Sequence, residues 1–114
     1  MLEFSGEERQ AICDTFDRLL SDNANEEALR KLIETESGFD NSLWQKMAEL
    51  GLTGLMVDPD YDGIGANIQE AEALMEVAGK YLYNGPFISS CVVAPALLQA
   101  SSNLSMVGPY LKNI

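Results

Sequence analysis

The hydrophobic and polar positions of this chain alternate with the period of an α-helix over most of its length. Side chains at positions i, i+3 and i+4 lie on one face of a helix, so an apolar stripe with this spacing predicts a helix with one buried face. The stripes that we identify are Ile12-Phe16-Leu19, Leu29-Leu32-Ile33, Leu43-Met47-Leu50, Ile68-Ala71-Leu74-Met75-Ala78-Leu82 and Leu104-Val107-Leu111-Ile114. Each stripe predicts one helix.

Capping signals indicate where three of these helices begin. A capping box pairs a polar residue at the helix start with an acid or amide three residues later, and the two side chains satisfy free backbone amides. The candidate pairs are Ser5 with Glu8, Ser42 with Gln45, and Asn67 with Glu70. Gly51 is expected to end the third helix in a left-handed conformation. Residues 52–57 are predicted as a short extended apolar piece, and 58–66 as a tight loop rich in turn formers.

The stretch 84–100 differs from the others because it is apolar on nearly every face and carries no charge. A helix that is apolar all round is expected to be buried all round, and this one is too short and too interrupted to span a membrane. Pro95 lacks a backbone donor, which predicts a kink near residues 91–94. With this helix the sequence predicts an all-α fold, an orthogonal bundle of about six helices in a single domain, residues 1–114.

Charge is concentrated in the first two thirds of the chain. There are 18 acidic and 7 basic residues, a net charge of −11, and every acid lies at or before Glu76. From Val77 onward only Lys80 and Lys112 are charged. A domain of this size has too much surface to hide its last third within itself. Two interpretations stay open: the uncharged third forms most of the core, or one of its faces meets another domain or subunit.

The composition argues against several classes of function. The negative charge disfavours nucleic acids and anionic membranes as partners. The absence of histidine removes an imidazole base and His–Cys metal sites. Cys13 and Cys91 are expected to be buried free thiols, which fits a reducing compartment. With no signal-peptide pattern at the N-terminus, a cytoplasmic location is the expectation.

The acidic residues of the fourth helix and of the loop are also predicted to have no catalytic or metal-binding role. Glu70, Glu72 and Glu76 are expected to face solvent, with Glu76 paired to Lys80 four residues later. The three aspartates of loop 58–66 would repel phosphate, and the loop lacks the acid that a calcium loop needs at its twelfth position. The sequence therefore predicts no metal site.

Three segments between residues 44 and 114 carry a family signature. They are Trp44-x-x-Met-Ala-Glu-Leu-Gly-Leu-Thr-Gly-Leu-Met-Val57, Tyr61-Asp-Gly-Ile-Gly65 and the ending Tyr110-Leu-Lys-Asn-Ile114. Together with the apolar stretch 84–100 they resemble the N-terminal helical domain of the acyl-CoA dehydrogenases, over residues 40–114. The loop departs from the family pattern, because Asp58 stands where Pro is usual, Pro59 where Glu is usual, and Asp62 replaces a Gly.

The resemblance implies that the chain is the N-terminal domain of a longer three-domain flavoenzyme. In this family a carboxylate base removes the α-proton of an acyl-CoA while FAD accepts the β-hydride. The base and most flavin and CoA contacts come from the middle β domain and the C-terminal helical domain. We therefore expect no catalytic residue, no cofactor-binding residue and no FAD in this piece alone. Its partners would be those missing domains or a partner subunit, in a homo- or hetero-oligomer.

The resemblance also implies a role for four residues in walling the acyl pocket. By position these are Pro86, Ser89, Ser90 and Val93, which share one stripe if the segment is an α-helix. Two hydroxyls and no large side chain would leave room for a bulky or polar acyl group. The same residues could instead be packing residues. Two functions without catalysis stay open as well: a stand-alone helical interaction module, and a carrier of a small apolar ligand.

Overall fold

The computed structural model describes residues 3–114, and every regular element in that range is helical. The predicted all-α fold of about six helices is therefore confirmed. The α-helices are α1 (Gly6–Asn23), α2 (Glu26–Ile33), α3 (Asn41–Glu49), α4 (Ile68–Lys80), α5 (Ala94–Gln99) and α6 (Leu104–Lys112). Two 3-10 turns, η1 (Leu52–Gly54) and η2 (Pro59–Tyr61), connect α3 to α4, and a π-helical segment, η3 (Ile88–Val93), leads directly into α5.

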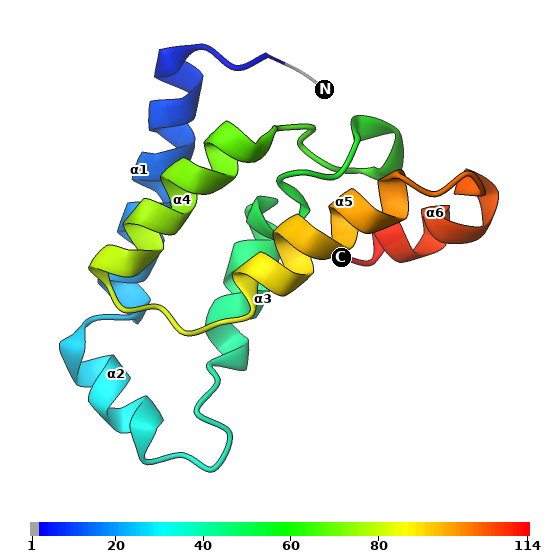
Figure 1. The fold of residues 1–114 in the computed structure, drawn as a ribbon. Helices are drawn as coiled ribbons and strands as arrows, with labels where there is room; N and C mark the ends of the chain where they lie inside the picture. Colours follow the sequence, from blue (N-terminus) through cyan, green and yellow to red (C-terminus); the bar gives the residue numbers. More distant parts are fainter. Residues whose placement is uncertain (1–2) are drawn as a thin grey trace.

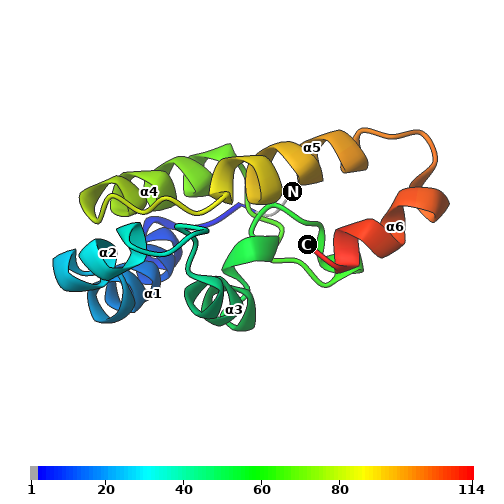
Figure 2. The same cartoon turned by 90° about the horizontal axis from the view of Figure 1, so that it is seen from below.

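The helices form two layers (Figures 1 and 2). α4 and the continuous η3–α5 segment lie in one layer, and α1, α2, α3 and α6 lie in the other. The molecule measures 44 × 35 × 19 Å, so its smallest dimension is about two helix diameters of ~10 Å each. Each layer therefore has an outer face that no other helix within residues 3–114 covers.

The core lies between the layers. It is formed by Phe16, Leu20, Leu43, Met47, Leu52, Leu55, Met56, Ala66, Ala71, Leu74, Phe87 and Cys91. The Phe16 ring of α1 stacks on Phe87 with centroids 6.2 Å apart, and meets the Tyr83 ring edge-on at 6.4 Å. These contacts hold the start of the 84–100 stretch against α1. Burying one such aromatic side chain contributes about 1.5–3 kcal/mol.

Two of the three predicted capping boxes form, at Ser5 with Glu8 and at Asn67 with Glu70. The third prediction is wrong. α3 begins after Asp40, whose carboxylate accepts a hydrogen bond from the Leu43 amide at 3.0 Å, so Ser42 already lies inside the helix. Aspartate caps helices as well as serine does, and it comes first in the chain. Gly51 has φ +80°, as predicted for a residue that ends a helix.

Residues 52–57 are buried but not extended. Their backbone folds into η1 and a following turn, which is held by hydrogen bonds from Ile64, Gly65 and Ala66 to carbonyls of residues 54–57 at 2.8–3.0 Å. Some members of the predicted apolar stripes are exposed and not buried: Ile33 72%, Leu50 48%, Ile68 52%, Leu82 71% and Leu104 44%. α2 contains no buried residue because it lies at the edge of the molecule (Figure 1).

The apolar stretch 84–100 is buried on one side only. Phe87, Cys91 and Pro95 face the core, while Ile88, Val93 and Leu97 are 52%, 46% and 70% exposed. The expectation that it is buried all round is wrong, because the part of the chain that the structure describes has no third layer to cover this side. Its backbone departs from α geometry where Pro95 predicted a disturbance: the Ala94 amide donates to Ser89, five residues back, as in a π-helix.

Candidate functional site

An apolar groove of about 500 Å³ lies between the last turns of α4 and the segment 83–93. α4 contributes Met75, Ala78 and Gly79, which share one helix face by their spacing. The other lining residues are Tyr83, Gly85, Pro86, Phe87, Ile88, Ser89 and Val93. We call this hollow the groove.

Three of the four residues predicted as an acyl wall line the groove: Pro86, Ser89 and Val93. Ser90 is half-buried and does not line it. Pro86 and Ser89, three positions apart, and Ser89 and Val93, four apart, share the groove face as expected, so only Ser90 departs from the predicted stripe.

The chemistry that the groove offers is limited to apolar contact. Its lining contains no charged residue, and its hydroxyls belong to Ser89 and Tyr83. The Ser89 hydroxyl donates to the Pro86 carbonyl at 3.3 Å. The groove can therefore hold an apolar group and exclude water, but it provides no acid, base or activated nucleophile. Among residues 3–114 no cluster of His, Cys, Asp or Glu could hold a metal ion.

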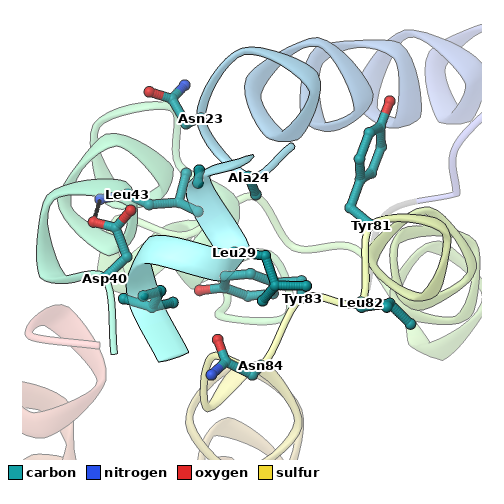
Figure 3. A pocket seen from close by; sticks show the side chains of 11 residues that line it. Asn23, Ala24, Leu29, Asp40, Leu43, Tyr81, Leu82, Tyr83 and Asn84 are labelled. Atoms are coloured by element: carbon teal, nitrogen blue, oxygen red, sulfur yellow. Dashed lines mark hydrogen bonds between the residues drawn. The ribbon is translucent and has the colours of Figure 1, made fainter. Parts of the chain in front are cut away.

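A second, smaller cavity of about 20 Å³ also borders Tyr83 (Figure 3). It is lined by the end of α1, by α2, by the start of α3 and by residues 81–84. The Tyr83 hydroxyl is buried and finds no hydrogen-bond partner among the described residues, and burial raises the pKa of Tyr83 to about 12. A Cβ at Gly85 would lie 2.0 Å from that hydroxyl, so a side chain at this position would displace the Tyr83 ring.

Glu70 is not solvent-facing, and this prediction is wrong. Its side chain is 1% exposed and accepts hydrogen bonds from Arg9 Nη2 and from the Asn67 amide, both at 3.3 Å. The carboxylate joins α1 to the start of α4, so it is a structural ion pair rather than a free acid in a cleft. Glu72 and Glu76 are exposed, as expected.

The predicted pair of Glu76 and Lys80 is replaced by a pair between helices. Lys80 Nζ lies 3.2 Å from Asp17 Oδ2 of α1, and the Tyr81 hydroxyl donates to the same carboxylate. The hydrogen bonds from Tyr81 and then Lys80 lower the pKa of Asp17, and Asp17 raises the pKa of Lys80. Polar contacts thus join α1 to both ends of α4, through Glu70 at its start and Lys80 at its end.

Neither cysteine has the environment of a reactive thiol. Both are free; Cys91 is buried, and burial raises its pKa to about 12. Cys13 is only half-buried, so the prediction of a buried thiol is confirmed for Cys91 alone. The pKa of Cys13 is also raised, mainly by its partial burial and secondly by the negative charge of Asp14. A raised pKa means little thiolate at neutral pH. Within the described residues, no helix has the length and apolar character needed to cross a membrane.

Comparison with known proteins shows which protein family the chain matches. Residues 6–105 match the family model of the acyl-CoA dehydrogenase N-terminal domain. Two curated relatives, each named acyl-CoA dehydrogenase IpdE2, are similar to the chain: that of Mycolicibacterium smegmatis is 31% identical over 93 residues, and that of Mycobacterium tuberculosis 28% over 96 residues. The matches cover 81% and 83% of this chain but 30% of each relative, so the chain spans about 30% of the length of these relatives. No solved structure matches the chain.

Proposed function

Because the chain belongs to the acyl-CoA dehydrogenase family through its N-terminal domain, we propose that it is part of an FAD-dependent enzyme that forms a double bond between Cα and Cβ of an acyl-CoA. The groove provides neither acid nor base, so the catalytic carboxylate belongs to regions outside this chain. Those regions correspond to the larger part of the relatives that the chain does not match. We assign to them a middle β domain and a C-terminal helical domain, in the same polypeptide or in a partner subunit.

The groove is the observation that carries this proposal. It lies on the segment where the family resemblance places the acyl wall, and Pro86, Ser89 and Val93 line it. An apolar wall binds the hydrocarbon part of a substrate and keeps water away from it. This chain would thus shape the acyl pocket without taking part in proton or hydride transfer.

The flavin does not fit the residues of this chain. An apolar groove and a net charge of −11 suit an acyl chain better than the pyrophosphate of FAD or the phosphates of CoA. When bound, FAD supplies the acceptor for the β-hydride, and we place its site and the CoA site in the other regions. The exposed side chains of Ile88, Val93 and Leu97 supply an apolar face against which such regions can pack. The free cysteines are consistent with a cytoplasmic enzyme.

Two alternatives without catalysis also draw on the groove. Because its lining contains no catalytic group, the same groove suits a carrier of an apolar ligand, or an interaction module that receives a partner helix.

Reduction of a bound flavin by an acyl-CoA distinguishes the proposed enzyme from these two alternatives. We expect the complete protein to bind FAD and to lose its visible flavin absorbance when mixed anaerobically with an acyl-CoA, and the 114-residue chain to bind no FAD. Stoichiometric FAD uptake by this chain alone, or acyl-CoA binding by the complete protein without flavin reduction, would contradict the proposal.

A further inference from the structure

Gly79, one of the residues that line the groove, has no explanation in the local fold. It lies within α4, its φ is not positive, and a Cβ built on it meets no atom within 4 Å. Glycine inside a helix is less favourable than alanine, because it loses more backbone freedom on folding. The fold would therefore be more stable with a side chain at this position, and there is space for one.

The end of α4 does not require this glycine either. The helix closes with a hydrogen bond from the Tyr83 amide to the Ala78 carbonyl at 3.0 Å, and one from the Leu82 amide to the Gly79 carbonyl at 3.1 Å. This is the pattern of a Schellman motif, in which glycine is preferred at the left-handed residue. That residue is Leu82, with φ +52°. The glycine thus stands three residues before the position that helix termination would favour.

The surroundings that remain are those of the groove. Gly79 lines it beside Ala78 and Met75, across from Pro86, Ser89 and Val93. A side chain at position 79 would project into open space on this face and narrow the groove. The volume of about 500 Å³ lies within the range of roughly 300–1,000 Å³ that is typical of small-molecule sites.

We propose that Gly79 is a specificity-determining residue, whose missing side chain keeps the groove wide enough for an apolar acyl group broader than one straight chain, either branched or cyclic. This inference rests on the proposed function. α4 supplies one wall of the acyl pocket, and η3 with the residues before it supplies the other. The lining of this groove offers no countercharge to a charged acyl group.

The test compares a straight and a cyclic substrate in the complete enzyme. We would measure kcat/KM for butyryl-CoA and cyclohexanecarbonyl-CoA in the wild type, in Gly79→Ala and in Gly79→Leu. The expected result is that the cyclic-to-straight ratio of kcat/KM falls about tenfold or more in Gly79→Leu, and by a smaller factor in Gly79→Ala. Gly79→Ala keeps the test valid if Gly79→Leu fails to fold. Gly6→Leu is the matched control, because a Cβ at Gly6 also meets no atom within 4 Å and Gly6 does not line the groove; its ratio should equal that of the wild type.

Failure of this inference can be distinguished from failure of the proposed function. A wild type that oxidises no acyl-CoA would overturn both. A wild type that oxidises butyryl-CoA but not the cyclic substrate would overturn the inference and leave the function standing. Folded Gly79 variants that keep the wild-type ratio of kcat/KM for the cyclic and straight substrates would also overturn the inference and leave the function standing.

Discussion

Arg9 and Glu70 join the first helix to the fourth across 61 positions of the sequence. Arg9 Nη2 lies 3.3 Å from Glu70 Oε1, and the side chain of Arg9 is 38% exposed while that of Glu70 is 1% exposed. The other carboxylate oxygen accepts from the Asn67 amide at the start of α4. The buried Glu70 carboxylate therefore caps the start of α4 and also binds Arg9 of α1.

The first prediction concerns this pair. Arg9→Ala should lower the free energy of unfolding by about 1–3 kcal/mol, because it leaves the buried Glu70 carboxylate without its cation. Urea unfolding, followed by Trp44 fluorescence, would measure the change. Arg30→Ala is the control, since it breaks the exposed pair with Glu26 and should change stability by less than about 0.5 kcal/mol. Equal changes in the free energy of unfolding for the two substitutions would show that the burial of Glu70 does not increase the contribution of its ion pair to stability.

The second prediction concerns the left-handed residue that ends α4. A left-handed conformation costs a leucine about 1–2 kcal/mol, and the Leu82 side chain is 71% exposed, so little burial offsets this cost. Leu82→Gly should therefore raise the free energy of unfolding by about 1 kcal/mol. Leu82→Ala keeps the Cβ and should bring no such gain. Thermal unfolding would measure both, and a destabilised Leu82→Gly would indicate that the leucine side chain packs in a way that its exposure does not suggest.

The third prediction is a loss of stability in alkali. Burial raises the pKa of the Cys91 thiol from 9.0 to about 12, and that of Tyr83 from 10.0 to about 12. The folded state then holds these protons more tightly than the unfolded state. The stability from this difference is present below pH 9 and is lost as the pH rises toward 12, at up to about 1.4 kcal/mol per pH unit for Cys91. Unfolding midpoints between pH 8 and 12 should fall less steeply in Cys91→Ala than in the wild type, and parallel curves would contradict the assignment.

The fourth prediction concerns the uncovered apolar face of the η3–α5 layer. Leu97 is largely exposed on this face, so the 114-residue chain by itself should self-associate as its concentration rises. Leu97→Glu should reduce this association without lowering the unfolding midpoint. Ile33→Glu is the control, because Ile33 is equally exposed on α2 at the far edge of the molecule. Sedimentation velocity would measure association, and a wild-type chain that stays monomeric at high concentration would count against a partner on this face.

The fifth prediction separates the two adjacent serines. Ser89 lines the groove and Ser90 does not. In the complete enzyme, Ser89→Leu should therefore shift acyl preference toward smaller groups, and Ser90→Leu should shift it less. The ratio of kcat/KM for long and short acyl-CoA substrates is the measurement. The opposite order would place the acyl wall on the face of η3 that carries Ser90.

The local features of this fold could be predicted from the sequence. Helical periodicity, the capping pairs at Ser5 and Asn67 and the left-handed Gly51 depend on residues within a few positions of each other, and all of them occur in the structure. Residues 40–114 are sufficient to indicate the family. These features need no knowledge of how the helices pack.

Features that depend on packing could not be predicted. Glu70 is buried because α1 brings Arg9 to it, and Lys80 pairs with Asp17 instead of Glu76 because α1 lies beside the end of α4. The exposure of Leu97 follows from a fold only two layers thick. The π turn of η3 could not be predicted either, because no spacing of apolar residues distinguishes a π turn from an α turn over six positions.

That π turn also makes η3 unusual among the helices in its tolerance of changes in chain length. Removing one residue from a regular α-helix rotates everything after it by about 100°, because each turn holds 3.6 residues. Between Ile88 and Val93 the wider turn carries a surplus residue, so a single-residue deletion can be absorbed when the segment closes into ordinary α geometry. α5 and α6 would then keep the same faces turned toward the core. The residues of η3 itself would rotate, and with them Ser89 and Val93, so one deletion would change the wall of the groove while leaving the later helices in place.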